Sequence, residues 1–213
     1  MIKENILKLK KQIPESASIV CVTKGRGVEQ IKEAIEAGLT DIGENRVQEA
    51  ILKHKALSTI DYRPSTIKWH MVGHLQTNKA KEAVKIFDLI QSVDSLRLAK
   101  EIDKEAAKIN KTQDTLIEVK TSPEATKFGI KPEEAIELIK EMSKFKNINI
   151  KGLMTIAPLV DNPEETRPYF RTLRELRDKI NGSWILSMGM TDDFKVAIEE
   201  GSNMVRLGRA IFE

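Results

Sequence analysis

The sequence contains a single cysteine, Cys21, among its 213 residues. A disulfide within the chain requires two cysteines, and structural zinc sites commonly use several. The composition therefore excludes an internal disulfide and a cysteine zinc cluster, and we expect no metal site.

Aromatic residues and excess charge are also scarce. Phe, Trp and Tyr make up 5% of the chain, and 35 Lys and Arg against 32 Asp and Glu leave a net charge of +3. Proteins that bind nucleic acid usually present stacking aromatic side chains or a strongly basic surface. Nucleic acid is therefore not expected as a partner.

Long apolar runs are missing as well. No run approaches the roughly 18 residues that a membrane span needs, and the first residues, MIKENILKLKKQ, scatter charge where a secretory signal has an apolar core. We expect a cytoplasmic protein without a membrane partner. The mixed charge and the lack of an obvious apolar stripe favour a monomer.

What the sequence does contain is a regular alternation of strand and helix patterns from one end to the other. The predicted strands cover residues 18–24, 40–43, 68–73, 89–94, 115–120, 148–156, 183–189 and 203–208. The predicted helices cover residues 4–11, 28–37, 47–55, 78–86, 95–109, 163–180 and 192–200, with one more after Pro132. The main irregular segment is 58–66.

Eight strands separated by seven helices, with one leading helix, are typical of a (β/α)₈ TIM barrel whose first helix fills the last gap. We predict one such α/β domain over residues 1–213. A doubly wound open sheet uses the same units and is the alternative. However, KGRGVEQ after the first strand lacks the G-x-G-x-x-G spacing of a dinucleotide site, and no P-loop is present.

Lys24 ends the first predicted strand, in IVCVTKGRG. Side chains alternate along a strand, so Val20, Val22 and Lys24 share one face, and Lys24 projects into the barrel mouth if the valines fill its interior. A desolvated lysine has a lowered pKa and can act as a nucleophile toward a carbonyl group. The alternative is a lysine that simply leads into a loop.

The last two strands suggest a phosphate site. LSMGMTDD offers Ser187 and Gly189 before a helix, and VRLGRA offers Arg206, Gly208 and Arg209. Phosphate sites in these barrels are often built from the loops after strands seven and eight, where small residues and a helix amino terminus favour an anion. A lysine beside a phosphate site predicts a phosphorylated aldehyde or ketone as ligand.

Other residues at strand ends allow other interpretations. Lys120 would serve a Schiff-base aldolase, although a loop lysine is the simpler account. His70 and His74 are four residues apart, but this spacing forms a metal site on a helix and they fall on a strand and its loop. Glu44 could orient Lys24 or form a structural hydrogen bond with a neighbouring strand.

Several segments, in order along nearly the whole chain, resemble the pyridoxal phosphate homeostasis proteins, also called the proline synthase co-transcribed family. The most specific are GHLQTNK and LSMGMTDD followed by GSNMVRLG. The resemblance implies a barrel similar to the amino-terminal domain of alanine racemase, with pyridoxal 5'-phosphate (PLP) bound as a Schiff base on Lys24. It also implies that such a protein buffers PLP, or passes it to apoenzymes, without catalysing a reaction.

The resemblance assigns further cofactor contacts. Ser187, Gly189, Gly208 and Arg209 match the phosphate-binding positions of the family, and Arg206 matches its arginine near the pyridine nitrogen. Asn45 and Met154 would lie near the cofactor. The chain departs from the family at Arg46, Arg209 and the residues after Lys24, where it has Gly25, Arg26 and Gly27.

A PLP-dependent racemase-like enzyme is the alternative function. An arginine at the pyridine nitrogen weakens the ring as an electron sink, which suits racemisation or storage better than transamination. A two-base racemase also needs a proton donor opposite the lysine. The two tyrosines, Tyr62 and Tyr169, fall in a predicted loop and a predicted helix, away from the strand ends, so we favour a carrier.

Overall fold

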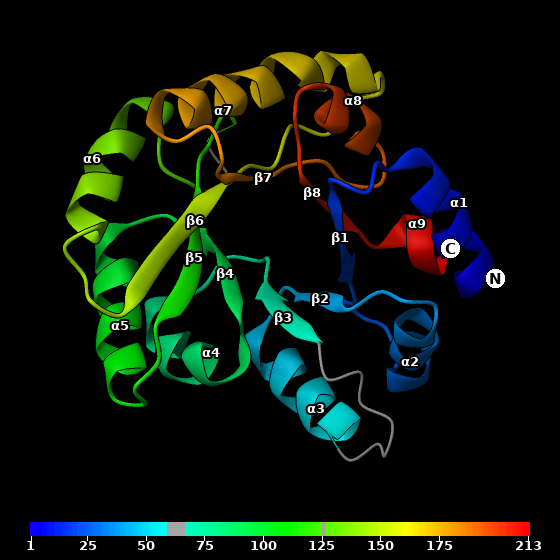
Figure 1. Cartoon of the computed structure of the whole chain (residues 1–213), viewed down its shortest axis with the longest axis horizontal. Helices are drawn as coiled ribbons and strands as arrows, with labels where there is room; N and C mark the ends of the chain where they lie inside the picture. Colours follow the sequence, from blue (N-terminus) through cyan, green and yellow to red (C-terminus); the bar gives the residue numbers. More distant parts are fainter. Residues whose placement is uncertain (59–66, 125–126) are drawn as a thin grey trace.

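Eight parallel strands close into a barrel in the order in which they occur along the chain, and helices form a ring around them (Figure 1). The computed structural model describes residues 1–58, 67–124 and 127–213. The strands are β1 (Ser18–Val22), β2 (Asp41–Glu44), β3 (Lys68–Met71), β4 (Leu89–Val93), β5 (Gln113–Glu118), β6 (Ile148–Met154), β7 (Ile185–Ser187) and β8 (Met204–Leu207). The α-helices are α1 (Ile2–Gln12), α2 (Val28–Glu36), α3 (Val47–Ser58), α4 (Ala80–Ile86), α5 (Leu96–Ala107), α6 (Pro132–Met142), α7 (Arg167–Ile180), α8 (Phe194–Glu199) and α9 (Arg209–Phe212).

The predicted (β/α)₈ barrel is therefore confirmed, with small differences at the element ends. Short 3₁₀ turns, η1 (Thr77–Lys79) and η2 (Pro163–Thr166), precede α4 and α7 where continuous helices were predicted. Helix α9 was not predicted. Of the irregular segment 58–66, all but Ser58 lies outside the described residues. No helix in the described ranges is long and apolar enough to span a bilayer.

Side-chain alternation along the strands separates two apolar cores. The barrel interior is filled by a small cluster of buried residues, namely Val20, Val72, Leu89, Leu116, Met154 and Met204. The larger cluster packs the outward-facing strand residues against the helices. Cys21 lies in this outer layer, and burial raises the pKa of its thiol to about 12, with a smaller effect from Glu44.

The first and last strands close the barrel. Residues Ser18 to Cys21 of β1 pair with Met204 to Leu207 of β8. Helix α1 packs against α2 and α9 (Figure 1), so the leading helix covers the gap after the last strand, as predicted. Closure places the turn after β1 beside the turn after β8, although these segments lie far apart in the sequence.

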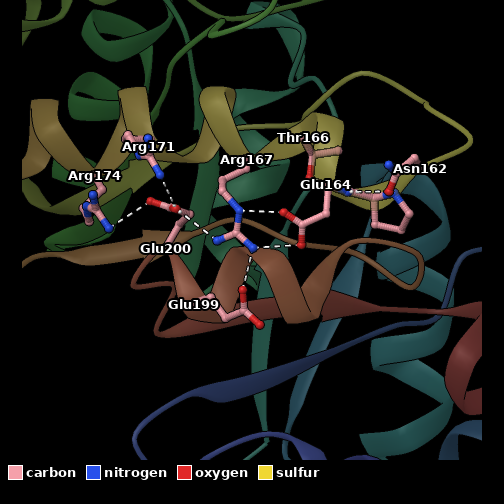
Figure 2. Close-up of polar contacts among 9 residues, drawn as sticks. Asn162, Glu164, Thr166, Arg167, Arg171, Arg174, Glu199 and Glu200 are labelled. Atoms are coloured by element: carbon pink, nitrogen blue, oxygen red, sulfur yellow. Dashed lines mark hydrogen bonds and ion pairs between the residues drawn. The ribbon is translucent and has the colours of Figure 1, made fainter.

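A charged cluster joins α7 to α8 (Figure 2). Glu200, directly after α8, is buried, and guanidinium nitrogens of Arg167, Arg171 and Arg174 lie 3.2, 3.1 and 2.8 Å from its carboxylate. Arg167 also contacts Glu164 and the exposed Glu199. Burial alone would raise the pKa of Glu200, but hydrogen bonds from Arg171 and Arg167 and the charge of Arg174 hold it below its ordinary value.

Candidate functional site

A cavity of about 450 Å³ opens at the carboxyl end of the barrel. Five of the eight predicted cofactor-binding residues lie on its wall: Lys24, Asn45, Arg206, Gly208 and Arg209. Val22, Val72 and Ile156 contribute apolar surface. A cavity with an apolar floor and few polar groups is the usual form of a small-molecule site.

Lys24 lies two residues beyond the end of β1, in a turn rather than in the strand that the sequence predicted. Gly25 follows it with φ +70, a backbone conformation that glycine adopts without strain. Within the described ranges, the Lys24 amine makes no hydrogen bond or ion pair, although Lys24 lines the cavity. The amine is therefore available to a ligand.

Arg206 lies on the inward face of β8 and is buried. Its Nη1 donates to Ser187 Oγ at 2.7 Å and its Nη2 donates to the Thr155 carbonyl at 2.8 Å. Burial lowers the pKa of Arg206 to about 10, while Asp193 and Glu118 act in the opposite direction. No described carboxylate lies within ion-pair distance of this cation, so the cavity holds a charged donor without a direct counter-charge.

Gly208 and Arg209 follow β8 at the cavity wall. A side chain at position 208 would meet the Val22 carbonyl at 3.3 Å, so the glycine keeps this part of the wall close to β1. Arg209 is exposed and pairs with Asp192, and the Ala210 N–H donates to Thr191 Oγ1 at 3.3 Å. These contacts link the turns after β7 and β8, where the sequence predicted a phosphate site.

The remaining three predicted residues lie off the cavity wall. Ser187 is fully buried, and its hydroxyl donates to Gln91 Oε1 at 2.6 Å. Gly189 has φ +95, and a Cβ there would lie 2.6 Å from Ala197 Cβ, so this glycine lets α8 pack against the end of β7. Met154 belongs to the interior cluster. Their contact with a ligand stays a prediction.

Glu44 does not contact Lys24. Its Oε1 accepts a hydrogen bond from Thr23 Oγ1 and pairs with Lys53 Nζ at 2.6 Å, in a buried position. This geometry favours the structural interpretation of Glu44. The neighbouring Asn45 has a buried Oδ1 without a hydrogen-bond partner among the described residues, and a ligand could supply one.

The histidines have structural partners. His70 Nε2 lies 2.9 Å from Asp41 Oδ1, and its Nδ1 lies 2.9 Å from Gln91 Nε2. His74 stacks on Phe128, with ring centroids 3.7 Å apart. The described part of the chain contains no group of three or more residues that could hold a metal ion.

Some wall residues were not expected from the sequence. Arg26 lines the cavity and pairs with Glu213, and Asp192 lines it and pairs with Arg209. Arg26 could have been predicted as a wall residue, because it lies two residues after Lys24 in the same turn. Its pairing with Glu213 depends on β1 meeting β8 in space, which local sequence does not reveal.

Comparisons with known proteins agree with this geometry. The family model described as alanine racemase, N-terminal domain, matches residues 1–213. The pyridoxal phosphate homeostasis protein of Aquifex aeolicus is 45% identical over 201 residues, which cover 92% of this chain and 86% of that protein. The protein of the same name from Synechocystis is 38% identical over 205 residues, covering 94% and 92%.

The chain belongs to the pyridoxal phosphate homeostasis protein family. Among solved structures, PipY of Synechococcus elongatus without PLP is 36% identical, with a TM-score of 0.92 and full coverage of both chains. PipY with PLP bound is 35% identical, with a TM-score of 0.90. An alanine racemase of Clostridium difficile, 21% identical with a TM-score of 0.81, shares the fold over 56% of its length.

Proposed function

We propose that the protein binds PLP as a Schiff base on Lys24 and acts as a non-catalytic carrier or buffer of PLP in vitamin B6 and amino-acid balance. One observation carries this proposal: a lysine amine and a buried arginine, neither with a carboxylate partner among the described residues, line one cavity. PipY, a relative of known structure, was solved with PLP bound.

The residues on the cavity wall suit the parts of PLP. The Lys24 amine would condense with the aldehyde and release water. Arg206 would donate to the pyridine nitrogen, whose lone pair accepts a hydrogen bond. Gly208, Gly189 and Arg209 would serve the phosphate, and Asn45 and Met154 would flank the ring. Ser187, for which the sequence predicted a phosphate contact, accepts from Arg206 and donates its one proton to Gln91, so its hydroxyl would support Arg206 instead. PLP itself supplies an electron sink.

A carrier role fits the wall better than racemisation. A two-base racemase needs a second proton donor opposite the lysine, and the described residues on this cavity wall include no tyrosine, histidine or cysteine. His74 lines a neighbouring cavity that Lys24 also borders, but its ring stacks on Phe128. Tyr169 lies on α7 and packs against the outer core, and Tyr62 lies outside the described residues. Incubation with a panel of amino acids, followed by chiral analysis, tests this point, because turnover well above free PLP would contradict the carrier role.

We further propose that the protein is a cytoplasmic monomer of one barrel domain that passes PLP to apoenzymes. A solution mass of 24.1 kDa is expected from light scattering, with and without PLP. A mass of twice this value would contradict the monomer.

The binding test is a visible-absorption titration with PLP. The wild-type protein should develop the visible band of a Schiff base, and Lys24→Ala should not. Lys120→Ala is the matched control, because Lys120 also follows a strand but does not line the cavity. Loss of the band in Lys120→Ala but not in Lys24→Ala would contradict the assignment.

A further inference from the structure

A chain of buried hydrogen bonds crosses the barrel interior and ends at Arg206. Arg206 Nη1 lies 2.7 Å from Ser187 Oγ, which lies 2.6 Å from Gln91 Oε1. Gln91 Nε2 lies 2.9 Å from His70 Nδ1, and His70 Nε2 lies 2.9 Å from Asp41 Oδ1. Four hydrogen bonds thus connect β8, β7, β4, β3 and β2.

We propose that Gln91, His70 and Asp41 are positioning residues that hold the Arg206 guanidinium in place for the cofactor from the opposite end of the barrel. This inference rests on the proposed function, since it treats Arg206 as the partner of the bound ring. None of the three residues lines the cavity, so each would act through Arg206 alone.

The donor directions along the chain are fixed by its two ends. A guanidinium can only donate and a carboxylate can only accept. Ser187 therefore accepts from Arg206 and donates to Gln91 Oε1, and the Gln91 amide donates to His70 Nδ1. His70 then carries its proton on Nε2 and donates it to Asp41, so every hydrogen bond points the same way.

Burial makes the chain costly to break. His70, Gln91, Ser187 and Arg206 are at most 4% exposed, and their neighbours in the interior are the apolar cluster around Leu89 and Met204. A polar group buried there without a partner loses its hydration without compensation, and hydrogen bonds in such surroundings strengthen one another. A fully bonded chain therefore allows few positions for the guanidinium.

The charges at the two ends of the hydrogen-bond chain support the same donor direction. Arg206 has no direct ion pair with any residue that the structure describes, and the hydrogen-bond chain ends at the carboxylate of Asp41, the first residue of β2. Burial alone would raise the pKa of Asp41, but hydrogen bonds from His70 and Thr40 and the charge of Lys68 hold it below its ordinary value. The hydrogen-bond chain thus joins a cation at the barrel mouth, Arg206, to an anion at the amino-terminal end of the barrel, Asp41.

The test compares PLP dissociation constants, measured by visible absorption, for variants that break the chain away from the cavity. Gln91→Met removes the central amide, and Asp41→Asn removes the terminal charge while keeping an acceptor. Each should raise the PLP dissociation constant, Gln91→Met by about tenfold, and shift the pH at which the visible band changes.

Gln113→Met is the matched control. Gln113 is also a fully buried strand amide, but it donates to the carbonyls of Asp88 and Asp114 and takes no part in the chain. It should lose stability as Gln91→Met does and bind PLP like the wild type. The inference would be overturned if the wild type and the three variants bound PLP equally well. It would also be overturned if Gln113→Met lost as much PLP affinity as Gln91→Met. A wild-type protein without a visible band would instead overturn the proposed function, and this inference with it.

Discussion

At the scale of single residues, the proposed site contains two cations, Lys24 and Arg206, that line one cavity. Neither has a carboxylate within ion-pair distance among the described residues. The place of Lys24 on the cavity wall could be predicted from the alternation of Val20 and Val22, although Lys24 is exposed and lies in the turn after β1. Arg206 could be predicted from its place before Gly208 on the last strand. The partners of Ser187 could not, because its hydroxyl donates to Gln91, a residue 96 positions away in the sequence.

Glu118 is a buried carboxylate that the proposed function does not use. Burial, with the nearby charge of Asp94, raises its pKa from 4.5 to about 7 although Arg206 acts against this, and its Oε2 has no hydrogen-bond partner in the described ranges. The folded state therefore holds a proton that the unfolded state releases between these values, so stability falls as pH rises through this window.

Glu118→Gln should consequently stabilise the protein at pH 8, by up to about 3 kcal/mol at about 1.4 kcal/mol per pKa unit. The gain should disappear below about pH 4, where Glu118 is largely neutral in both states. Urea unfolding at the two pH values measures it. A variant that is equally destabilised at both would show that ionised Glu118 costs the folded state nothing.

Arg206→Met should separate binding from stability. The substitution removes a buried charge whose pKa is lowered to about 10 by burial, but it also leaves Ser187 and Thr155 without a donor. These effects oppose each other, so we expect the free energy of unfolding without PLP to change by less than about 1 kcal/mol. The PLP dissociation constant should rise at least about tenfold. A loss of several kcal/mol in stability would show that the guanidinium is mainly structural.

At the scale of elements, the alternation of strand and helix patterns was sufficient to predict all eight strands and the barrel. The ends of elements were less accurate. Strands β1 and β3 end two residues before their predicted limits, because inward-facing polar residues and glycines prolong the strand pattern into the turns. Helix α9 has only four residues, too few for a periodic signal.

The α7–α8 cluster in Figure 2 could not be predicted, because it joins arginines of one helix to the residue after another. Glu200→Gln should destabilise the protein by about 1–3 kcal/mol, since three guanidinium groups lose a shared, buried counter-charge. Chemical denaturation measures this difference.

Glu199→Gln is the neighbouring control. Glu199 is exposed and, among the described residues, pairs with Arg167 alone, so its loss should change stability by less than about 1 kcal/mol. The depressed pKa of Glu200 also sets a pH window: its contribution should be complete above the unfolded value near 4.5 and lost as pH falls through the lower folded value. Equal effects of the two substitutions would contradict the importance of the cluster.

At the scale of the whole molecule, closure of the barrel brings together the residues that line the cavity. Pairing of β1 with β8 places the turn that carries Lys24 beside the turn that carries Gly208 and Arg209, so both ends of the chain contribute to one cavity. The fold was predictable from the pattern of elements. The arrangement of polar groups was not, because each depends on partners brought together only by closure.

The most direct test of the central claim is to reduce the PLP-loaded protein with borohydride and locate the modified residue by mass spectrometry. We expect one adduct, on Lys24, and none in Lys24→Ala. An adduct on Lys120, or adducts scattered over surface lysines, would contradict the claim that this cavity holds an aldehyde on Lys24.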